Sequence, residues 1–374
     1  MDIKKIFHPI NYVGYKTNRK IVVIESDDWG NEKFSDLKHY SLALNKKLID
    51  NSVYSIYDSL ESNEDIEQIM EVLNGFKDKN ENPPILTANY VTANPDYEKM
   101  KSEQITNYYY KPSKELYSKY FNKEKVPQLY VDAISKKLIK PQYHCREHID
   151  VDRWMKALIK GDKLALESFD CKFVNIGRSE ITGKRKGITA AYDFDANFDM
   201  NNFKDNLQEM KSLFFDMFGF YSTTFIAPAY TWHRDLEKCL SEIGVKALQG
   251  NWKQTSPYPV DKINSYRYIK HYLGQKNKFN QIYLVRNASF EPTIMPKVDA
   301  VNDCLRSVNT AFKFGKPAII GSHRVNFIGS LVESNRTRNL KLLKQLLTEI
   351  VKRWPDVEFM SSDELGDLIL QSKK

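Results

Sequence analysis

Two adjacent aspartates near the start of the chain are the first residues whose chemistry could be catalytic. Asp27 and Asp28 follow the apolar run 21–24, whose β-branched side chains predict a strand covered on both faces. Functional residues of β/α folds gather where strands give way to loops. One carboxylate could bind a metal ion while its neighbour accepts a proton. The same pair could instead cap a turn or the next helix.

Two histidines form the second such feature. His144 and His148 stand at the ends of the segment HCREH, after a predicted strand over 141–144 and before a helix predicted from Asp150 or Asp152. Neutral imidazoles at this spacing can bind one zinc-like ion. An aspartate from another strand end would complete the three-ligand, open arrangement of catalytic metal sites.

A third histidine has a similar position. His323 follows the apolar run that begins at Ala318, so it is predicted at the end of another parallel strand. The carboxyl ends of parallel strands lie on one face of a barrel. One shared site explains the aspartate pair, His144 and His323 better than three unrelated structural roles.

The chain between these residues alternates short apolar runs with amphipathic segments. This alternation predicts an α/β fold, and we expect a distorted (β/α)7-type barrel in a single domain. The predicted strands after the first are 85–90, 141–144, 188–194, 223–228, 245–249, 317–323 and 357–360. The predicted helices run from Ser62 to Gly75, from Asp150 or Asp152 to Gly161, from Phe203 to Gly219, from Asp235 to Ile243, and along a leucine stripe ending at Trp354.

Domain boundaries follow from these elements. The predicted parts are a polar lead-in over 1–19, the barrel domain over 20–374, and insertions within it at 95–140 and 253–300. The first insertion is rich in tyrosine and lysine. In the second, the segments 268–273 and 281–286 flank a polar turn and predict a hairpin excursion.

Composition limits the class of protein. The 374 residues are 41% hydrophobic and carry a formal net charge of +8, enough for a sizeable core. Basic residues are spread along the chain, which excludes a nucleic-acid arm and leaves an acidic glycan or a membrane surface as a suitable anionic partner.

The four cysteines form no CxxC pair, so a disulfide framework or thiolate zinc site is not expected. With no signal peptide or membrane-spanning stretch, we expect a cytoplasmic protein; its oligomeric state is left open.

The ordered motifs resemble those of the polysaccharide deacetylases, the NodB-homology or carbohydrate esterase family 4 group. The aspartate pair after an apolar strand is similar to the first family motif, HCREH to the second, and the strand delivering His323 to the last. The three motifs occur in the family's order and are widely separated as in the family, and together they cover about residue 20 to residue 330. The resemblance implies a distorted (β/α)7 barrel with a metal-dependent active site.

The same resemblance implies roles for these residues. Asp28, His144 and His148 would hold a divalent ion, with Zn²⁺ the expected metal, while Asp27 would be the general base and His323 the general acid. The activity implied is removal of N- or O-acetyl groups from a sugar or polysaccharide precursor, for instance in surface polysaccharide synthesis. The partner would be that acetylated glycan.

One family motif departs from the pattern. The family has Arg-x-Pro-aromatic-Gly, whose arginine orients the base, and this chain has Ile226 at the arginine position before Pro228. Arg324 or Arg146 could substitute for it. The resemblance assigns the oxyanion-binding N–H to Ala229. Further predicted substrate contacts are Asn89, Asp193, Tyr230, Trp232, Arg324 and Asn326, residues of types that also cap helices, brace loops or fill cores. Trp252, beside Asn251, is a loose match to the family's tryptophan motif.

Three other functions fit parts of the sequence. The missing arginine would suit a catalytically impaired glycan-binding protein of the same fold. HCREH also matches the H-x-x-E-H signature of zinc metalloproteases, which requires a helix with Glu147 as base and leaves Asp27, Asp28 and His323 unused. A glycoside hydrolase using Asp193 and Asp195 would leave the histidines without a role.

Overall fold

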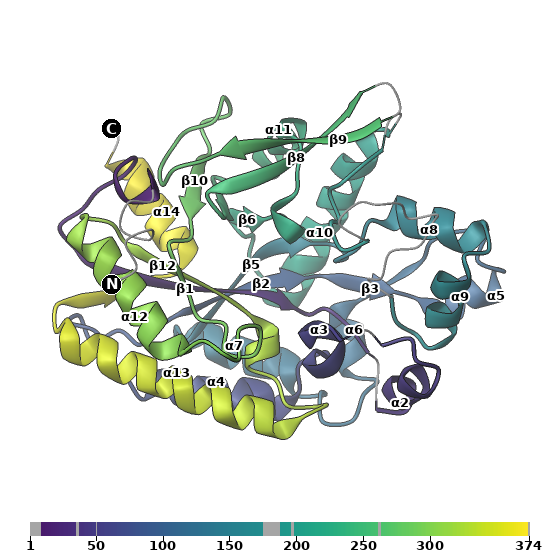
Figure 1. Ribbon diagram of the computed structural model, residues 1–374, viewed down its shortest axis with the longest axis horizontal. Helices are drawn as coiled ribbons and strands as arrows, with labels where there is room; N and C mark the ends of the chain where they lie inside the picture. Colours follow the sequence, from purple (N-terminus) through teal and green to yellow (C-terminus); the bar gives the residue numbers. More distant parts are fainter. Residues whose placement is uncertain are drawn as a thin grey trace.

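A parallel β-sheet forms the centre of the molecule (Figure 1). This computed structural model describes residues 9–34, 37–49, 51–174, 188–195, 198–260 and 263–372. In spatial order the strands are β10 (Ile282–Val285), β7 (Ala247–Gly250), β6 (Thr224–Ile226), β5 (Ile139–Cys145), β2 (Leu86–Val91), β1 (Lys20–Trp29), β12 (Ala318–His323) and β11 (Ala288–Ser289). A further strand, β13 (Val357–Phe359), pairs with the start of β1.

The sheet curls but does not close. β10 and β11 lie at opposite ends of the strand order, although only Arg286 and Asn287 separate them in the sequence. The barrel is therefore open at this seam. The predicted distorted (β/α)7-type barrel is confirmed, with the aspartate strand β1 in its interior, paired on both sides.

The inner face of the sheet changes from apolar to polar along its strands. Ile21 and Val23 of β1 share one cluster with residues of β7, β10 and β12 and with the helix α14 (Ser362–Gln371), which contacts β1, β6, β7 and β10. Because side chains alternate along a strand, Glu25 and Asp27 point to this same face. Glu25 contacts Arg286 across the barrel. The polar groups thus gather inside the barrel at its carboxyl end.

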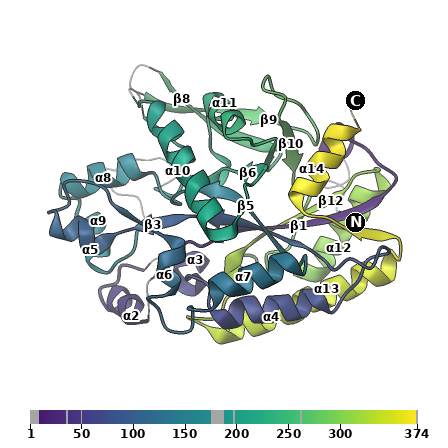
Figure 2. The same ribbon diagram turned by 180° about the vertical axis from the view of Figure 1, so that it is seen from behind.

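Amphipathic helices cover the outer face of the sheet (Figure 2). They are α4 (Asn63–Asn74), α7 (Val126–Ser135), α10 (Asn201–Phe218), α11 (Arg234–Glu242), α12 (Ala300–Lys313) and α13 (Glu333–Arg353). Ser62 begins α4 with a reciprocal capping box to Asp65, and Gly219 ends α10 in a left-handed conformation with φ of 75°. These caps explain why the predicted helices have nearly the observed bounds.

Two predicted elements are wrong. Residues 188–194 form turns and loop instead of a strand. The hairpin joins β8 (Lys253–Val260) to β9 (Ile263–Lys270), while the segment 281–286 supplies β10 to the main sheet. The reason is burial: Ile282–Val285 is fully buried and apolar, as a parallel strand requires, whereas β9 is polar and belongs to an outlying ribbon.

The remaining elements form the loops around the barrel mouth. They are η1 (Pro9–Asn11), α2 (Leu37–Asn45), α3 (Val53–Tyr57), β3 (Ala93–Pro95), α5 (Tyr97–Ser102), β4 (Tyr110–Pro112), α6 (Ser113–Tyr117), α8 (Val151–Ile159), α9 (Lys163–Asp170), η2 (Pro228–Tyr230) and η3 (Arg324–Asn326). Within the described residues, no helix combines the length and apolar character needed to cross a membrane.

Candidate metal-dependent catalytic site

An irregularity at the end of β1 separates the two aspartates. The register of β1 against β2 shifts between Ser26 and Trp29. Asp28 adopts a left-handed conformation with φ of 77°, which aspartate tolerates better than most residues. Asp27 contacts residues inside the barrel while Asp28 turns towards β5. Two neighbours in sequence thereby reach different partners at one barrel end.

Asp28, His144 and His148 converge as the sequence predicted. Asp28 Oδ1 lies 3.4 Å from His144 Nε2 and 3.1 Å from His148 Nε2. One potential ligand atom of each residue lies within 4.8 Å of the others. Burial raises the pKa of Asp28, but positive charge and hydrogen bonds from His148 and His144 outweigh it when their Nε2 atoms carry protons, and that pKa then lies well below its usual value. A cation shared by the three residues would take the place of those protons. Asp28 is therefore an ionised carboxylate.

The environment of His144 fits metal binding. Its Nδ1 lies 2.8 Å from the carbonyl oxygen of Ile226, which can only accept, so Nδ1 carries the proton. Its buried Nε2 therefore presents a lone pair and has no hydrogen-bond partner among the described residues. A lone pair facing the Asp28 carboxylate is unfavourable unless a cation lies between them. The three residues thus fit a divalent ion.

The HCREH segment is not helical. His144 is the penultimate residue of β5, which ends at Cys145, and residues 146–149 form a bend that leads to α8, whose N-cap is Asp150. Glu147 is buried and bonded to Arg146 and Asn206. This differs from the helical H-x-x-E-H arrangement, in which the glutamate faces the metal as base.

Asp27 is held by three hydrogen bonds. Arg286 donates from Nη2 to Oδ1 at 2.6 Å and from Nη1 to Oδ2 at 2.8 Å, and Asn89 Nδ2 donates to Oδ1 at 2.7 Å. Burial raises the pKa of Asp27, but the Arg286 guanidinium more than compensates and lowers it to about 2. Asp27 is thus ionised and fixed in orientation.

Arg286 is the main residue that the sequence analysis missed. It follows β10 directly and also bonds Glu25 Oε2 at 2.7 Å and the Tyr230 hydroxyl at 3.0 Å. A Cβ on Gly321 of β12 would lie 2.7 Å from Arg286 Cδ, so only glycine leaves room for this side chain. Two features of the sequence could have indicated this role of Arg286: its position at the end of an apolar run, and the glycine two residues before His323. The prediction of a hairpin over 281–286 obscured the first feature.

Arg324 and Arg146, the two predicted substitutes for the family arginine, bind other carboxylates. Arg324 is completely buried and bonded to Asp58 and Glu61. Arg146 pairs with Glu147 and Glu209. Neither contacts Asp27, so this suggestion is wrong, and the burial of Arg324 excludes the predicted substrate contact.

His323 lies beside Asp27 at the end of β12. Its Nδ1 is 2.6 Å from Glu291 Oε1 and its Nε2 is 3.7 Å from Asp27 Oδ2. Burial lowers the pKa of His323, but the Glu291 carboxylate, with contributions from Asp27 and Asp28, raises it to about 10. His323 is consequently protonated at neutral pH, with Nε2 directed towards Asp27.

Several predicted substrate contacts are structural. Asn89 and Asn326 are buried and brace Asp27 and Glu291 respectively. Trp232 is buried and donates from Nε1 to Glu237 at 3.1 Å, so it cannot stack on a sugar. Asp193 is not at a strand end; it is buried against Arg153 and Tyr266, which leaves no route to substrate hydroxyls.

The turn after β6 borders the site. Ala229 and Tyr230 have φ of 52° and 51°, and the Tyr230 hydroxyl accepts a hydrogen bond from Arg286. The turn is closed by bonds from Tyr230 N to Ala227 O and from Thr231 N to Pro228 O. This conformation keeps the turn next to the base, and the oxyanion role of the Ala229 N–H stays a prediction.

A buried carboxylate connects the two halves of the site. Glu61 accepts hydrogen bonds from Gly30 N at 3.0 Å, Tyr117 at 2.6 Å, Tyr130 at 3.0 Å and Arg324 Nη1 at 2.8 Å. Gly30 follows the aspartate pair and Arg324 follows His323. Glu61 therefore fixes the loop of the metal ligand relative to the strand of the predicted acid.

A cavity of about 640 Å³ lies at the barrel seam. Its lining includes Tyr230 and Arg286 beside Asp27, Glu291 beside His323, and also Trp252 and Met295. Concave sites that combine aromatic and polar groups are the usual form of ligand pockets. Trp252 lines the same cavity as Tyr230 and Arg286, and its match to the tryptophan motif stays a prediction.

No family model matches this chain, and no curated protein resembles it in sequence. Among solved structures, a protein from Mycobacterium smegmatis assigned as a polysaccharide deacetylase is 10% identical, with a TM-score of 0.49 over 98% of this chain and 96% of that one. One from Parabacteroides distasonis assigned as a glycoside hydrolase or deacetylase is 12% identical, with a TM-score of 0.49 over 98% and 73%. The PuuE allantoinase is 8% identical, with a TM-score of 0.47 over 96% and 91%. Similarities this weak do not decide the chemistry of the site.

Proposed function

We propose that this protein is a metal-dependent hydrolase that removes acetyl groups from an acetylated sugar. The observation that carries the proposal is that the ionised Asp27 and the protonated His323 lie side by side. The trio of Asp28, His144 and His148 lies next to them. Asp27 Oδ2 and His323 Nε2 are 3.7 Å apart, with pKa values moved in opposite directions to about 2 and about 10. Environments that separate two pKa values in this way mark a base and an acid.

The trio would hold the metal. One carboxylate and two neutral imidazoles suit Zn²⁺ better than a hard cation such as Mg²⁺. When bound, such an ion lowers the pKa of water and polarises an acyl carbonyl. The Ile226 carbonyl fixes the tautomer of His144 so that Nε2 stays available.

The protein's own groups would move the protons. Asp27 accepts a proton from the water whose oxygen adds to the acyl carbon, and Arg286 keeps that carboxylate in place. His323 gives its Nε2 proton to the sugar nitrogen or oxygen as its bond to the acyl carbon breaks. The products are acetate and a free amine or hydroxyl. The Ala229 N–H is proposed to hold the developing oxyanion.

The seam cavity is the proposed entrance for the sugar. Amide and hydroxyl side chains line it together with Trp252, a combination suited to hydroxyl groups and to the apolar face of a sugar ring. Because its lining reaches Tyr230, Arg286 and Glu291, a sugar held there would bring its acetyl group near Asp27 and His323.

Two alternatives lose their main arguments. The impaired glycan-binding protein rested on Ile226, but Arg286 makes the bidentate contact with Asp27 from another strand. The metalloprotease needs a helical HCREH with Glu147 facing the metal, and Glu147 is instead bonded to Arg146 and Asn206.

Metal analysis beside acetate release tests the proposal. The purified protein should bind about one equivalent of zinc and release acetate from N-acetylglucosamine oligomers or O-acetylated xylan. Asp28→Ala and His148→Ala should lose metal and activity together, while the control His233→Ala, outside the site, should keep both. A chain that binds no divalent ion, or a metal-loaded chain that releases no acetate from either substrate class, would refute it.

A further inference from the structure

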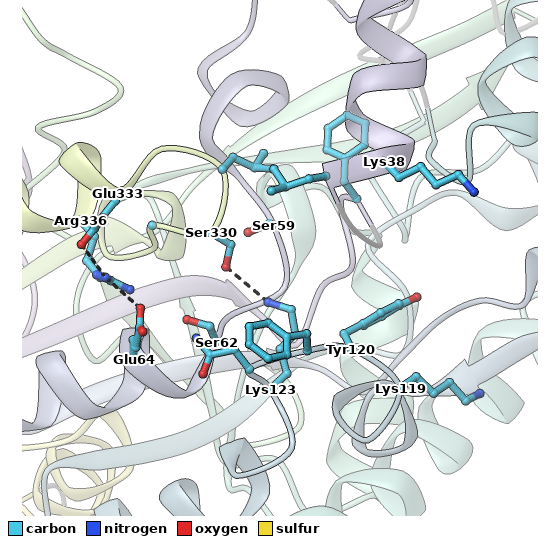
Figure 3. Close-up of a pocket in the computed structure, with 16 residues that line it drawn as sticks. Lys38, Ser59, Ser62, Glu64, Lys119, Tyr120, Lys123, Ser330, Glu333 and Arg336 are labelled. Atoms are coloured by element: carbon cyan, nitrogen blue, oxygen red, sulfur yellow. Dashed lines mark hydrogen bonds and ion pairs between the residues drawn. The ribbon is translucent and has the colours of Figure 1, made fainter.

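A second cavity, of about 580 Å³, lies apart from the catalytic groups (Figure 3). It is bordered by α2, by the loop before α4, by residues 119–123, and by residues 329–336 at the start of α13. It shares no lining residue with the seam cavity or with the proposed metal site. This cavity is therefore a separate feature of the molecule.

The charges around this cavity are divided. On one side, Arg336 is neutralised by Asp65 at 2.7 Å and Glu64 at 3.2 Å. Lys123 lies near the middle of the cavity, and Lys38 and Lys119 lie at its outer edge (Figure 3). Among the residues that the structure describes, no carboxylate forms a direct ion pair with these three lysines.

Lys123 is the unusual member of this group. Its side chain is buried, with 6% of the residue exposed, and its ammonium donates to the Leu60 carbonyl and lies 3.4 Å from Ser330 Oγ. Neither partner carries a charge. A buried ammonium is costly unless an anion balances it. Burial lowers the pKa of Lys123 to about 8 although the Asp65 and Glu61 carboxylates act in the opposite direction, and neither carboxylate is in direct contact with the ammonium.

A neighbouring hydroxyl also lacks a partner. Ser59 is 4% exposed, and its Oγ makes no hydrogen bond within the described part of the chain. In Figure 3 the hydroxyls of Ser59 and Ser330 and the ammonium of Lys123 lie around the middle of the cavity. Together they offer two hydroxyl groups and one cation to a small group with several acceptor oxygens.

The rest of the wall is apolar and partly open. Phe34 and Leu331 line it, and Leu37 and Phe121 are 59% and 97% exposed beside it. Large apolar side chains this exposed, next to unpaired cations, suit a ligand with an anionic head and an apolar body.

We propose that this cavity binds a phosphoester whose phosphate meets Lys123, Ser59 and Ser330 and whose apolar part lies on Leu37 and Phe121. A phosphate dianion matches the set better than a carboxylate does, because lysines at 38 and 119 add to the charge of Lys123 and lysine is a common phosphate ligand. The phosphoester could be a soluble metabolite or a lipid headgroup, which share this chemistry.

Calorimetric titration of the full chain with hexyl phosphate and with inorganic phosphate tests the proposal. Hexyl phosphate should bind saturably and more tightly than inorganic phosphate. Lys123→Gln should weaken hexyl phosphate binding on the order of tenfold, and the exposed pair Lys38→Ala/Lys119→Ala should weaken it several-fold even if Lys123→Gln fails to fold. Phe121→Ser should weaken hexyl phosphate only.

The matched control is Lys125→Ala, which removes an exposed charge near Lys123 but outside the cavity and should leave binding unchanged. Co-sedimentation with phosphatidic acid vesicles, but not with phosphatidylcholine vesicles, would identify a lipid source if Lys123→Gln abolishes it. Absence of saturable binding to both probes, or equal affinity in the lysine variants and the control, would overturn the proposal. No metal or turnover is needed, so this outcome is independent of the proposed hydrolase activity.

Discussion

The two aspartates of β1 have the same side chain but different surroundings. Asp27 faces a guanidinium and an amide, whereas Asp28 faces two imidazoles. Guanidinium stays charged at neutral pH, so Arg286 fixes the Asp27 carboxylate in its ionised form while lowering its pKa. Imidazoles supply lone pairs that can share a cation with Asp28. Their surroundings therefore suit Asp27 to the proposed role of base and Asp28 to the proposed role of metal ligand.

Arg286 should be essential to the geometry of the base. Arg286→Lys keeps the charge but cannot form two parallel bonds to Asp27, and we expect kcat to fall on the order of tenfold; Arg286→Gln should cost about 10²-fold. The measurement is acetate release at saturating substrate, with metal content determined on the same samples. Unchanged kcat in Arg286→Gln, or loss of metal with it, would contradict this role.

Glu291 should set the alkaline limit of activity. An acid must be protonated, so kcat/KM should fall as pH rises past the pKa of His323, which Glu291 raises towards about 10. Removing that charge in Glu291→Gln lowers the pKa, and the alkaline limb should move to lower pH. A cation on the trio offsets the contribution of Asp28 but not that of Glu291. The check is a pH profile of kcat/KM; coincident alkaline limbs in both proteins would argue against His323 as the acid.

At the scale of elements, the contact between Arg286 and Asp27 depends on how closely the end of β10 approaches β12. Arg286 crosses the inner face over Gly321 to reach Asp27, and it does so from the open seam where the two sheet ends face each other. A closed barrel with another strand in this gap would leave no room for it. The incomplete closure of the sheet is thus part of how the base is oriented.

Gly321→Ala should reproduce the loss of Arg286. The added Cβ would stand 2.7 Å from Arg286 Cδ, and displacing the side chain should lower kcat by about 10²-fold. Gly250→Ala, at the end of β7, is the matched control because its nearest contact would be an ordinary 3.8 Å. Acetate release compares the two, and equal rates would mean that Arg286 tolerates the methyl group.

At the scale of the whole molecule, a buried polar network ties distant segments to the site. Glu61, from the loop before α4, joins the backbone after Asp28 to Arg324 after His323, and two tyrosines from α6 and α7 complete it. Buried networks of this kind are favourable only when every member is satisfied. The relative position of metal ligand and acid therefore depends on the packing of outer helices.

Glu61→Gln should be strongly destabilising. It leaves Arg324 with a single carboxylate partner, Asp58, in a fully buried position, and breaking a buried pair costs about 3–5 kcal/mol. Urea unfolding measures this as a lower midpoint at unchanged slope. The control Glu67→Gln lies exposed on α4, the helix that follows Glu61, and should unfold like the parent. Similar midpoints for both variants would show that the network adds little.

The sequence by itself determined the local structure and indicated which side chains would meet at the candidate site. The run 21–24 is buried on both faces as its β-branched residues predicted, and the caps at Ser62 and Gly219 bound their helices. The spacing of His144 and His148 after a strand also predicted that both would lie at one strand end, where the structure places them beside Asp28. These features depend on neighbours in the chain, and local patterns record such neighbours directly.

Only the tertiary structure decided which partners those side chains meet. Arg286 lies 259 positions from Asp27, and Arg324 lies next to the site in sequence yet is bonded elsewhere. Trp232 and Asp193 have types suited to sugar binding but are buried. Such outcomes depend on which strand ends a curled sheet brings together and on where it stays open. That arrangement is set by the packing of the whole chain and leaves no local pattern at any one residue.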